Sequence, residues 1–178
     1  MKKVLVLGVR KGEEHQHKAN DYFKKSKKIY VDLKNSDVNH NLNEFPYPFK
    51  DHEFDGIFAS HIVEHIRKDL LIKFMEELWR ICKNKSKIYI FVPHFSNVST
   101  STHPTHYGQF GRGTFDYFCD NCEGWEKYLV GKFDLIYKKV VIPRRFFFVR
   151  IFGLSYWENY LSSIFPAHEI KFILEIKK

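Results

Sequence analysis

Short aliphatic segments that alternate with helix-like patterns are the feature that most limits the fold of this chain. Val4 to Leu7 is a continuous aliphatic run that ends at Gly8, which is typical of a parallel strand buried on both faces. Because parallel neighbours need crossover connections, the alternation predicts an open α/β sheet with helices on both faces. Further strands are predicted at residues 29–32, 38–42, 54–59 and 87–92, and helices at 13–26 and 70–82.

The second half of the chain has a different character. Residues 94–106 are rich in Ser, Thr and His, which indicates a loop, and residues 114–122 are predicted to be helical. Two more strands are predicted at 133–142 and 169–176, around an aromatic and basic insert, and the second alternates well enough to be antiparallel. A length of 178 residues fits one domain, so we expect a single mostly parallel sheet with an antiparallel C-terminal strand.

Composition narrows the class of protein but names no ligand. Hydrophobic residues make up 44% and charged residues 28%, as in an ordinary globular domain, and 29 basic against 21 acidic residues give a net charge of +8. This charge favours an anionic partner or a mildly basic surface. The early apolar run is too short for a signal peptide, and no stretch has the roughly 20 apolar residues of a membrane span. The chain has three cysteines, Cys82, Cys119 and Cys122, which are too few for a disulfide scaffold. We therefore expect a protein of a reducing compartment, the cytoplasm.

Several segments in the middle of the chain resemble one known family. They cover about half of the chain in the right order and spacing: Asn41–Phe49, Phe54–His65, Glu77–Lys83, Ile88–Phe95 and Pro104–His106. The sequence resembles the class I S-adenosylmethionine-dependent methyltransferases and, among them, a group of small methyltransferase-like proteins. The resemblance implies a Rossmann-like fold, S-adenosylmethionine as cofactor, and methyl transfer to a small-molecule or polymeric acceptor.

The resemblance also implies where the cofactor binds. A loop after the first strand would bring backbone close to the cofactor, and an acidic residue ending the second strand would accept hydrogen bonds from the ribose. Arg10 departs from the family pattern, which usually has a glycine there. It would either meet the methionine carboxylate or exclude the cofactor and leave a non-catalytic binding module. The implied cofactor-binding residues are Gly8, Val9, Arg10, Gly12, Asp32, Asn41, Leu42, Ala59, Ser60 and His61.

Methyl transfer to a hydroxyl or amine needs alignment of donor and acceptor and removal of a proton. Histidine is the natural base near neutral pH, and three histidines are predicted at the carboxyl edge of the sheet: His61, His94 and His106. Residues 95–118 and 144–165 are the predicted acceptor-side or lid segments. Because they contain many aromatic and basic residues, they favour an anionic or aromatic acceptor over nucleic acid. The candidate acceptor-binding residues in these segments are Tyr107, Arg112, Arg144 and Arg145.

Two patterns suggest a metal instead. Residues 61–65 match H-x-x-E-H, a zinc peptidase signature, but they directly follow a predicted strand inside the methyltransferase-like block. A second set of two histidines and two cysteines has ligand types that suit tetrahedral zinc. Cysteines on a predicted helix are equally well explained as small buried residues. We therefore expect no metal site, and a zinc enzyme using His61, Glu64 and His65 is the less favoured alternative. The second set is His103, His106, Cys119 and Cys122.

Overall fold

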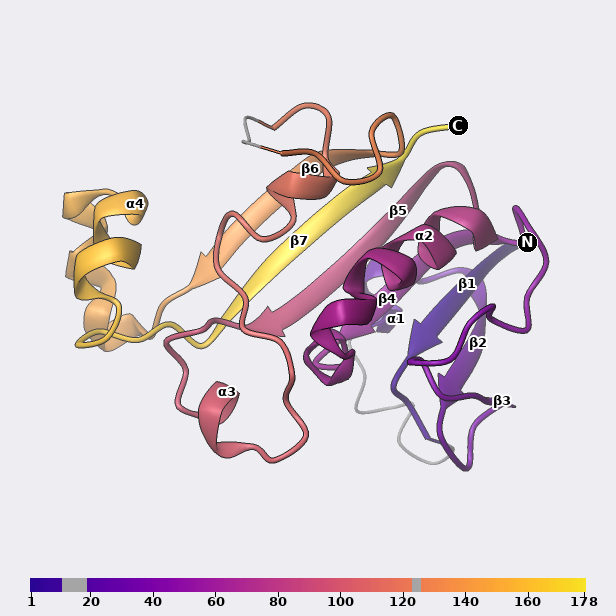
Figure 1. The fold of residues 1–178 in the computed structure, drawn as a ribbon, viewed down its shortest axis with the longest axis horizontal. Helices are drawn as coiled ribbons and strands as arrows, with labels where there is room; N and C mark the ends of the chain where they lie inside the picture. Colours follow the sequence, from indigo (N-terminus) through magenta and orange to yellow (C-terminus); the bar gives the residue numbers. More distant parts are fainter. Residues whose placement is uncertain (11–18, 123–125) are drawn as a thin grey trace.

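One sheet organises the computed structural model, which describes residues 1–10, 19–122 and 126–178 (Figure 1). Its strand order is β3-β2-β1-β4-β5-β7-β6. The pairs among β1 to β5 are parallel, whereas β7 runs antiparallel to both β5 and β6. This confirms the predicted mostly parallel sheet. The strands are β1 Lys2–Leu7, β2 Ser26–Asp32, β3 Val38–Asn39, β4 Phe54–Ser60, β5 Cys82–Pro93, β6 Phe133–Val141 and β7 Glu169–Ile176.

Strand β1 is buried on both faces, as its unbroken aliphatic run predicts. Leu5 and Leu7 belong to the larger core, which packs against the helix α2, Leu71–Ile81. Val4 and Val6 point the other way, into a smaller cluster with Phe58 of β4 and the short helix α1, Ala19–Tyr22. Both faces of the central strands are therefore covered, and their carboxyl ends form one edge of the sheet (Figure 1).

Helix α2 confirms the prediction for residues 70–82, because its apolar stripe lies on the sheet and buries Phe74, Met75, Leu78 and Ile81. A 3-10 turn, η3 Lys68–Leu70, precedes it. The helix predicted over 13–26 ends earlier, at Tyr22, because Ser26 already begins β2 and pairs with β1. Residues 13–18 of that prediction lie outside the described residues.

Two other predicted elements are shorter than expected. The strand predicted over 38–42 stops at Asn39, because Asn41 turns the chain by accepting the backbone N–H groups of Asn43 and Glu44. The helix predicted over 114–122 is wrong apart from the 3-10 turn η4, Asp116–Phe118. Here Cys119 forms a β-bridge to Phe133, which ties the backbone to the sheet instead of to a helical turn.

The insert before β7 forms a projection beyond the end of β6 (Figure 1). It consists of η5 Arg144–Phe152, α4 Leu154–Tyr156 and the π-helical turn η6 Trp157–Leu161. Trp157 anchors it, because this side chain is fully buried and its Nε1 donates to the carbonyl of Phe165 at 3.0 Å. Two short helical turns follow strands of the sheet. After β4 comes η2, Val63–His65, and after β5 comes α3, Ser99–Thr102. Within the described residues, no helix has the length and apolar character needed to span a membrane.

Candidate functional site

The carboxyl ends of β1, β2 and β4 open into a pocket of about 590 Å³. Val9 and Ala59 are fully buried and do not line it, and neither does Ser60. Gly12 lies outside the described residues. The structure thus brings together six of the ten predicted cofactor-binding residues at one edge of the sheet, where open α/β folds bind their ligands. The six are Gly8, Arg10, Asp32, Asn41, Leu42 and His61.

Gly8 makes the sharp turn that ends β1. Its φ is +74°, a conformation that favours glycine, and its N–H donates to the carbonyl of Val31 at 2.7 Å. A β-carbon at this position would lie 2.8 Å from Cδ1 of Ile62, which is too close for any side chain. Both the backbone conformation and the close approach of Ile62 therefore require glycine at the pocket wall.

Asp32 ends β2 and places its carboxylate in the same pocket. Its Oδ1 accepts the backbone N–H of Leu33 at 2.6 Å and lies 3.6 Å from Nε of Arg10. The Arg10 side chain is 57% exposed, so it reaches Asp32 from the solvent side. The carboxylate predicted to hold a ribose is consequently paired with a cation in the free protein, through a contact that solvent screens.

His61 lies between two carboxylates. Its Nε2 is 3.0 Å from Oε2 of Glu169, and its Nδ1 is 3.5 Å from Oε1 of Glu64. Hydrogen bonding to Glu169 and then to Glu64 raises the pKa of His61 to about 9, in spite of partial burial. The residue has a positive φ of 54°, and its N–H donates to the carbonyl of Phe91 at 2.8 Å. At neutral pH, His61 is therefore a fixed cation in the pocket wall and not a proton acceptor.

His94 and Arg112 do not line the pocket, and both instead form hydrogen bonds to Glu158. His94 is fully buried, with Nδ1 2.7 Å from Oγ of Ser96 and Nε2 3.1 Å from Oε1 of Glu158. The same Glu158 oxygen accepts the backbone N–H of Arg112 at 2.7 Å, and Nη1 of Arg112 donates to Ser155. Glu158 thus joins the two predicted acceptor segments to the end of β5.

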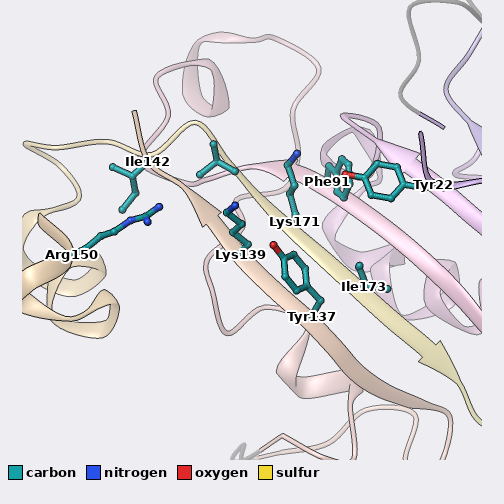
Figure 2. Close-up of a pocket in the computed structure, with 9 residues that line it drawn as sticks. Tyr22, Phe91, Tyr137, Lys139, Ile142, Arg150, Lys171 and Ile173 are labelled. Atoms are coloured by element: carbon teal, nitrogen blue, oxygen red, sulfur yellow. The ribbon is translucent and has the colours of Figure 1, made fainter. Parts of the chain in front are cut away.

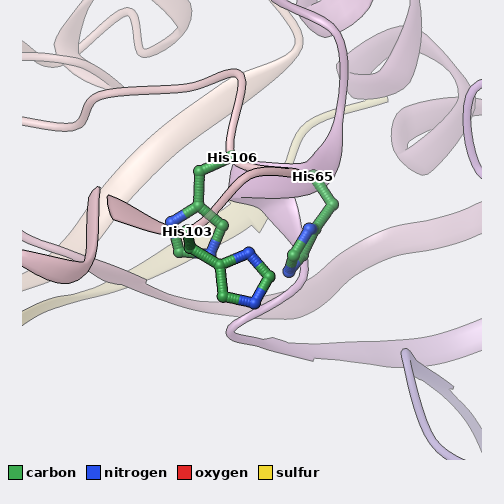
Figure 3. A group of neighbouring side chains, drawn as sticks. All are labelled: His65, His103 and His106. Atoms are coloured by element: carbon green, nitrogen blue, oxygen red, sulfur yellow. The ribbon is translucent and has the colours of Figure 1, made fainter. Parts of the chain in front are cut away.

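Three histidines form a cluster at the edge of the pocket (Figure 3). One potential ligand atom from each of His65, His103 and His106 lies within 4.8 Å of the others. Thr105 sits among them, with its Oγ1 2.8 Å from Nδ1 of His65 and 3.1 Å from Nδ1 of His103. Burial lowers the pKa of His106, which favours its neutral form. His65 and His103 line the pocket together with Tyr107, the one candidate acceptor residue that does so.

The cluster differs from both metal arrangements suggested by the sequence. It includes neither His61, whose ring is held by Glu169 and Glu64, nor the two cysteines. Burial raises the pKa of the Cys119 thiol, as expected for a small buried residue. Sequence reasoning missed the grouping of His65 with His103, because the two come from separate loops; the only signal was the density of histidines in residues 94–106.

A second hollow, of about 480 Å³, lies on the β5, β7 and β6 part of the sheet and shares no lining residue with the pocket (Figure 2). Lys139, Lys171 and Arg150 give it a basic character. Arg144 and Arg145 line neither hollow, and the Arg145 guanidinium lies 4.8 Å from the Phe146 ring. The structure therefore does not bring these two arginines to the predicted cofactor site.

Comparison with known proteins agrees with the fold. The sequence model of a family described as a methyltransferase domain matches residues 5–90. A S-adenosylmethionine-dependent methyltransferase from Archaeoglobus fulgidus superposes with a TM-score of 0.64 at 18% identity, over 99% of this chain and 86% of that chain. Among curated proteins, no relative matches the sequence.

Two further solved structures share the fold. A Haloferax volcanii methyltransferase, solved with the Trm112 methyltransferase activator, has a TM-score of 0.62 at 12% identity, over 99% of this chain and 82% of that one. The other is the 1,6-didemethyltoxoflavin-N1-methyltransferase of Burkholderia thailandensis, solved with 1,6-didemethyltoxoflavin and S-adenosylhomocysteine. It has a TM-score of 0.61 at 13% identity, over 99% of this chain and 72% of that chain. The family match over residues 5–90 and the shared fold agree with the resemblance to methyltransferases found in the sequence.

Proposed function

We propose that the protein is an S-adenosylmethionine-dependent methyltransferase whose cofactor binds in the pocket at the ends of β1, β2 and β4. The observation that carries the proposal is that Gly8 and Asp32 meet in one pocket. Gly8 turns the chain sharply at the end of β1 with no side chain, and Asp32 presents a carboxylate at the end of the neighbouring strand. This is the arrangement that a nucleoside cofactor with two ribose hydroxyls requires.

The other pocket residues fit the rest of the cofactor. Leu42, which is 7% exposed, and Asn41 would border the adenine. Arg10 supplies positive charge that suits the carboxylate of the methionine part, whereas Glu169 and Glu64 balance the charge of His61. The bound cofactor would supply a methyl group on a cationic sulfonium, and the chain would hold the acceptor in line with it.

The three candidate bases differ in their fitness for the role. His61 is protonated and His94 is enclosed by Ser96 and Glu158, so neither suits proton removal. His106 has a lowered pKa and lies beside the pocket, next to His65. We therefore assign acceptor activation to the edge of the pocket formed by the histidine cluster.

Calorimetric titration with S-adenosylhomocysteine tests the cofactor site directly. Asp32→Asn should weaken binding by about tenfold or more, because the ribose hydroxyls lose a charged hydrogen-bond acceptor. The matched control is Asp37→Asn, since Asp37 is exposed and lies outside the pocket. Equal affinity of the two variants would remove Asp32 from the site, and no binding by the unaltered protein would refute the proposal.

The second candidate is a binding module that keeps the fold and lacks methyl transfer. The pairing of Arg10 with Asp32 favours it, because Arg10 occupies the position of a family glycine and already holds the carboxylate that the ribose needs. The same contact is long and exposed, which argues that the cofactor can replace it. Substitution of Arg10 separates the two candidates, as argued below.

A further inference from the structure

The histidine cluster has the composition of a transition-metal site. Neutral imidazole nitrogen is a preferred ligand of zinc, and three histidines with a fourth, open position are a known arrangement of catalytic zinc. His65 and His106 are partly buried, whereas His103 is exposed, so the cluster is shielded on one side and accessible on the other. Figure 3 shows the three rings close together.

The hydrogen bonds around the cluster leave nitrogen lone pairs available. Nδ1 of His65 lies 3.1 Å from the backbone carbonyl of Thr105, which can only accept a hydrogen bond, so Nδ1 carries a hydrogen and donates it to this carbonyl. Nδ1 of His103 lies 3.1 Å from Oγ1 of Thr105 and accepts the backbone N–H of Thr105 at 3.4 Å. A histidine that donates one ring N–H to a carbonyl or hydroxyl and offers the other nitrogen is the usual state of a metal ligand.

His106 supplies the independent observation. Its Nδ1 is buried and has no hydrogen-bond partner among the described residues. A buried nitrogen without a partner loses the free energy of hydration that it had in the unfolded chain, so it needs a compensating ligand. A metal ion would provide one. The His106 ring stacks on that of His103 with centroids 4.4 Å apart, which keeps the two side chains next to each other.

We propose that His65, His103 and His106 bind a zinc ion whose open position faces the pocket and takes the thiol or hydroxyl of the methyl acceptor. The acceptor part rests on the proposed function. An acceptor bound there would release its proton to solvent. Its lone pair would then bond the methyl carbon as the carbon–sulfur bond breaks, with that electron pair returning to sulfur to leave neutral S-adenosylhomocysteine. Tyr107, exposed beside His65 and His103 in the same pocket, would border the acceptor.

Metal titration of the full chain tests the site without any need for cofactor. After treatment with a chelator, the protein should bind one zinc per chain in calorimetry, and cobalt(II) should give the visible spectrum of a tetrahedral site. His103→Ala should weaken zinc binding by at least about tenfold. This side chain is exposed, so the variant should fold, which circular dichroism checks. His168→Ala is the matched control, because His168 is exposed and outside the cluster.

Three outcomes would overturn the site: no zinc binding, equal zinc affinity of His103→Ala and His168→Ala, or a cobalt spectrum without tetrahedral character. A thiol probe, mercaptoethanol, tests the open position, because its thiolate should add a sulfur-to-cobalt charge-transfer band to the loaded protein. An unchanged spectrum would refute the acceptor role. Protein that binds S-adenosylhomocysteine but no zinc refutes only the metal site, whereas protein that binds zinc but not S-adenosylhomocysteine refutes only the proposed function.

Discussion

At the scale of single residues, charge decides how the pocket can work. The carboxylate of Asp32 lies in the pocket, but Nε of Arg10 is 3.6 Å from it. His61 would be a candidate base from its position alone, yet its two carboxylate neighbours keep it charged. The Arg10–Asp32 contact and the ion pair of His61 with Glu169 join residues far apart in sequence, so residue type and position along the chain did not predict them.

Arg10→Ala should change the affinity for S-adenosylhomocysteine by less than about fivefold. The Arg10–Asp32 pair is long and its cation is 57% exposed, and such pairs contribute about 0.2 to 1 kcal/mol. The cofactor can therefore displace Arg10 at little cost. Calorimetric titration of both proteins measures the ratio. A much larger gain in affinity on substitution would show that Arg10 blocks the site and would support the non-catalytic binding module.

The stability of the protein should depend on pH through His61. Its pKa rises from 6.5 to about 9 on folding, so the stabilisation is fully present below about pH 6.5 and is lost as the pH rises through 9. The side chain is 50% exposed, and after allowance for solvent screening we expect on the order of 1 kcal/mol. Urea unfolding at several pH values should show this loss in the unaltered protein and a flatter profile in His61→Gln. A profile unchanged by the substitution would contradict the ion pairs.

At the scale of elements, the pattern of apolar residues predicted the helices and strands that pack in the core, but it did not predict the segments in which the chain turns. Helix α2 and strand β7 follow from periodicity, because each has one clearly apolar face. The segment 114–122 has a similar spacing of apolar residues but forms only the 3-10 turn η4. There, Nζ of Lys127 donates to the carbonyls of Asp116 and Cys119, at 2.9 Å each, and so satisfies groups that a helix would have bonded internally.

Glu158 should be essential for holding the two acceptor-side segments together. In Glu158→Ala, the buried Nε2 of His94 and the backbone N–H of Arg112 both lose their acceptor, which we expect to cost about 2 kcal/mol of unfolding free energy. Urea unfolding measures this cost. The control is Glu76→Ala, whose carboxylate is 48% exposed and 3.8 Å from Lys132, with an expected change within about 0.5 kcal/mol. Similar losses in the two variants would mean that Glu158 is an ordinary surface carboxylate.

At the scale of the whole molecule, the sheet has two halves, each with its own hollow. The β1, β2 and β4 half carries the pocket, and most of its predicted residues follow from the order of strands, because parallel strands end at one edge. The β5, β7 and β6 half carries the basic hollow and the projection at 144–165 (Figure 1, Figure 2). What could not be predicted is how loops from the second half, such as residues 103–107, fold back onto the first, since loop contacts leave no periodic pattern.

Arg144 and Arg145 test whether these halves bind different ligands. Both are exposed and line neither hollow, so Arg144→Ala combined with Arg145→Ala should leave the affinity for S-adenosylhomocysteine within about twofold of the unaltered protein. If the projection binds an anionic acceptor, the same variant should reduce transfer of a labelled methyl group from S-adenosylmethionine into extract fractions, because acceptor binding loses two cations. Calorimetry and scintillation counting measure the two effects separately. Weakened cofactor binding in a folded variant would place the arginines in the cofactor site, and unchanged methyl transfer would remove them from acceptor binding.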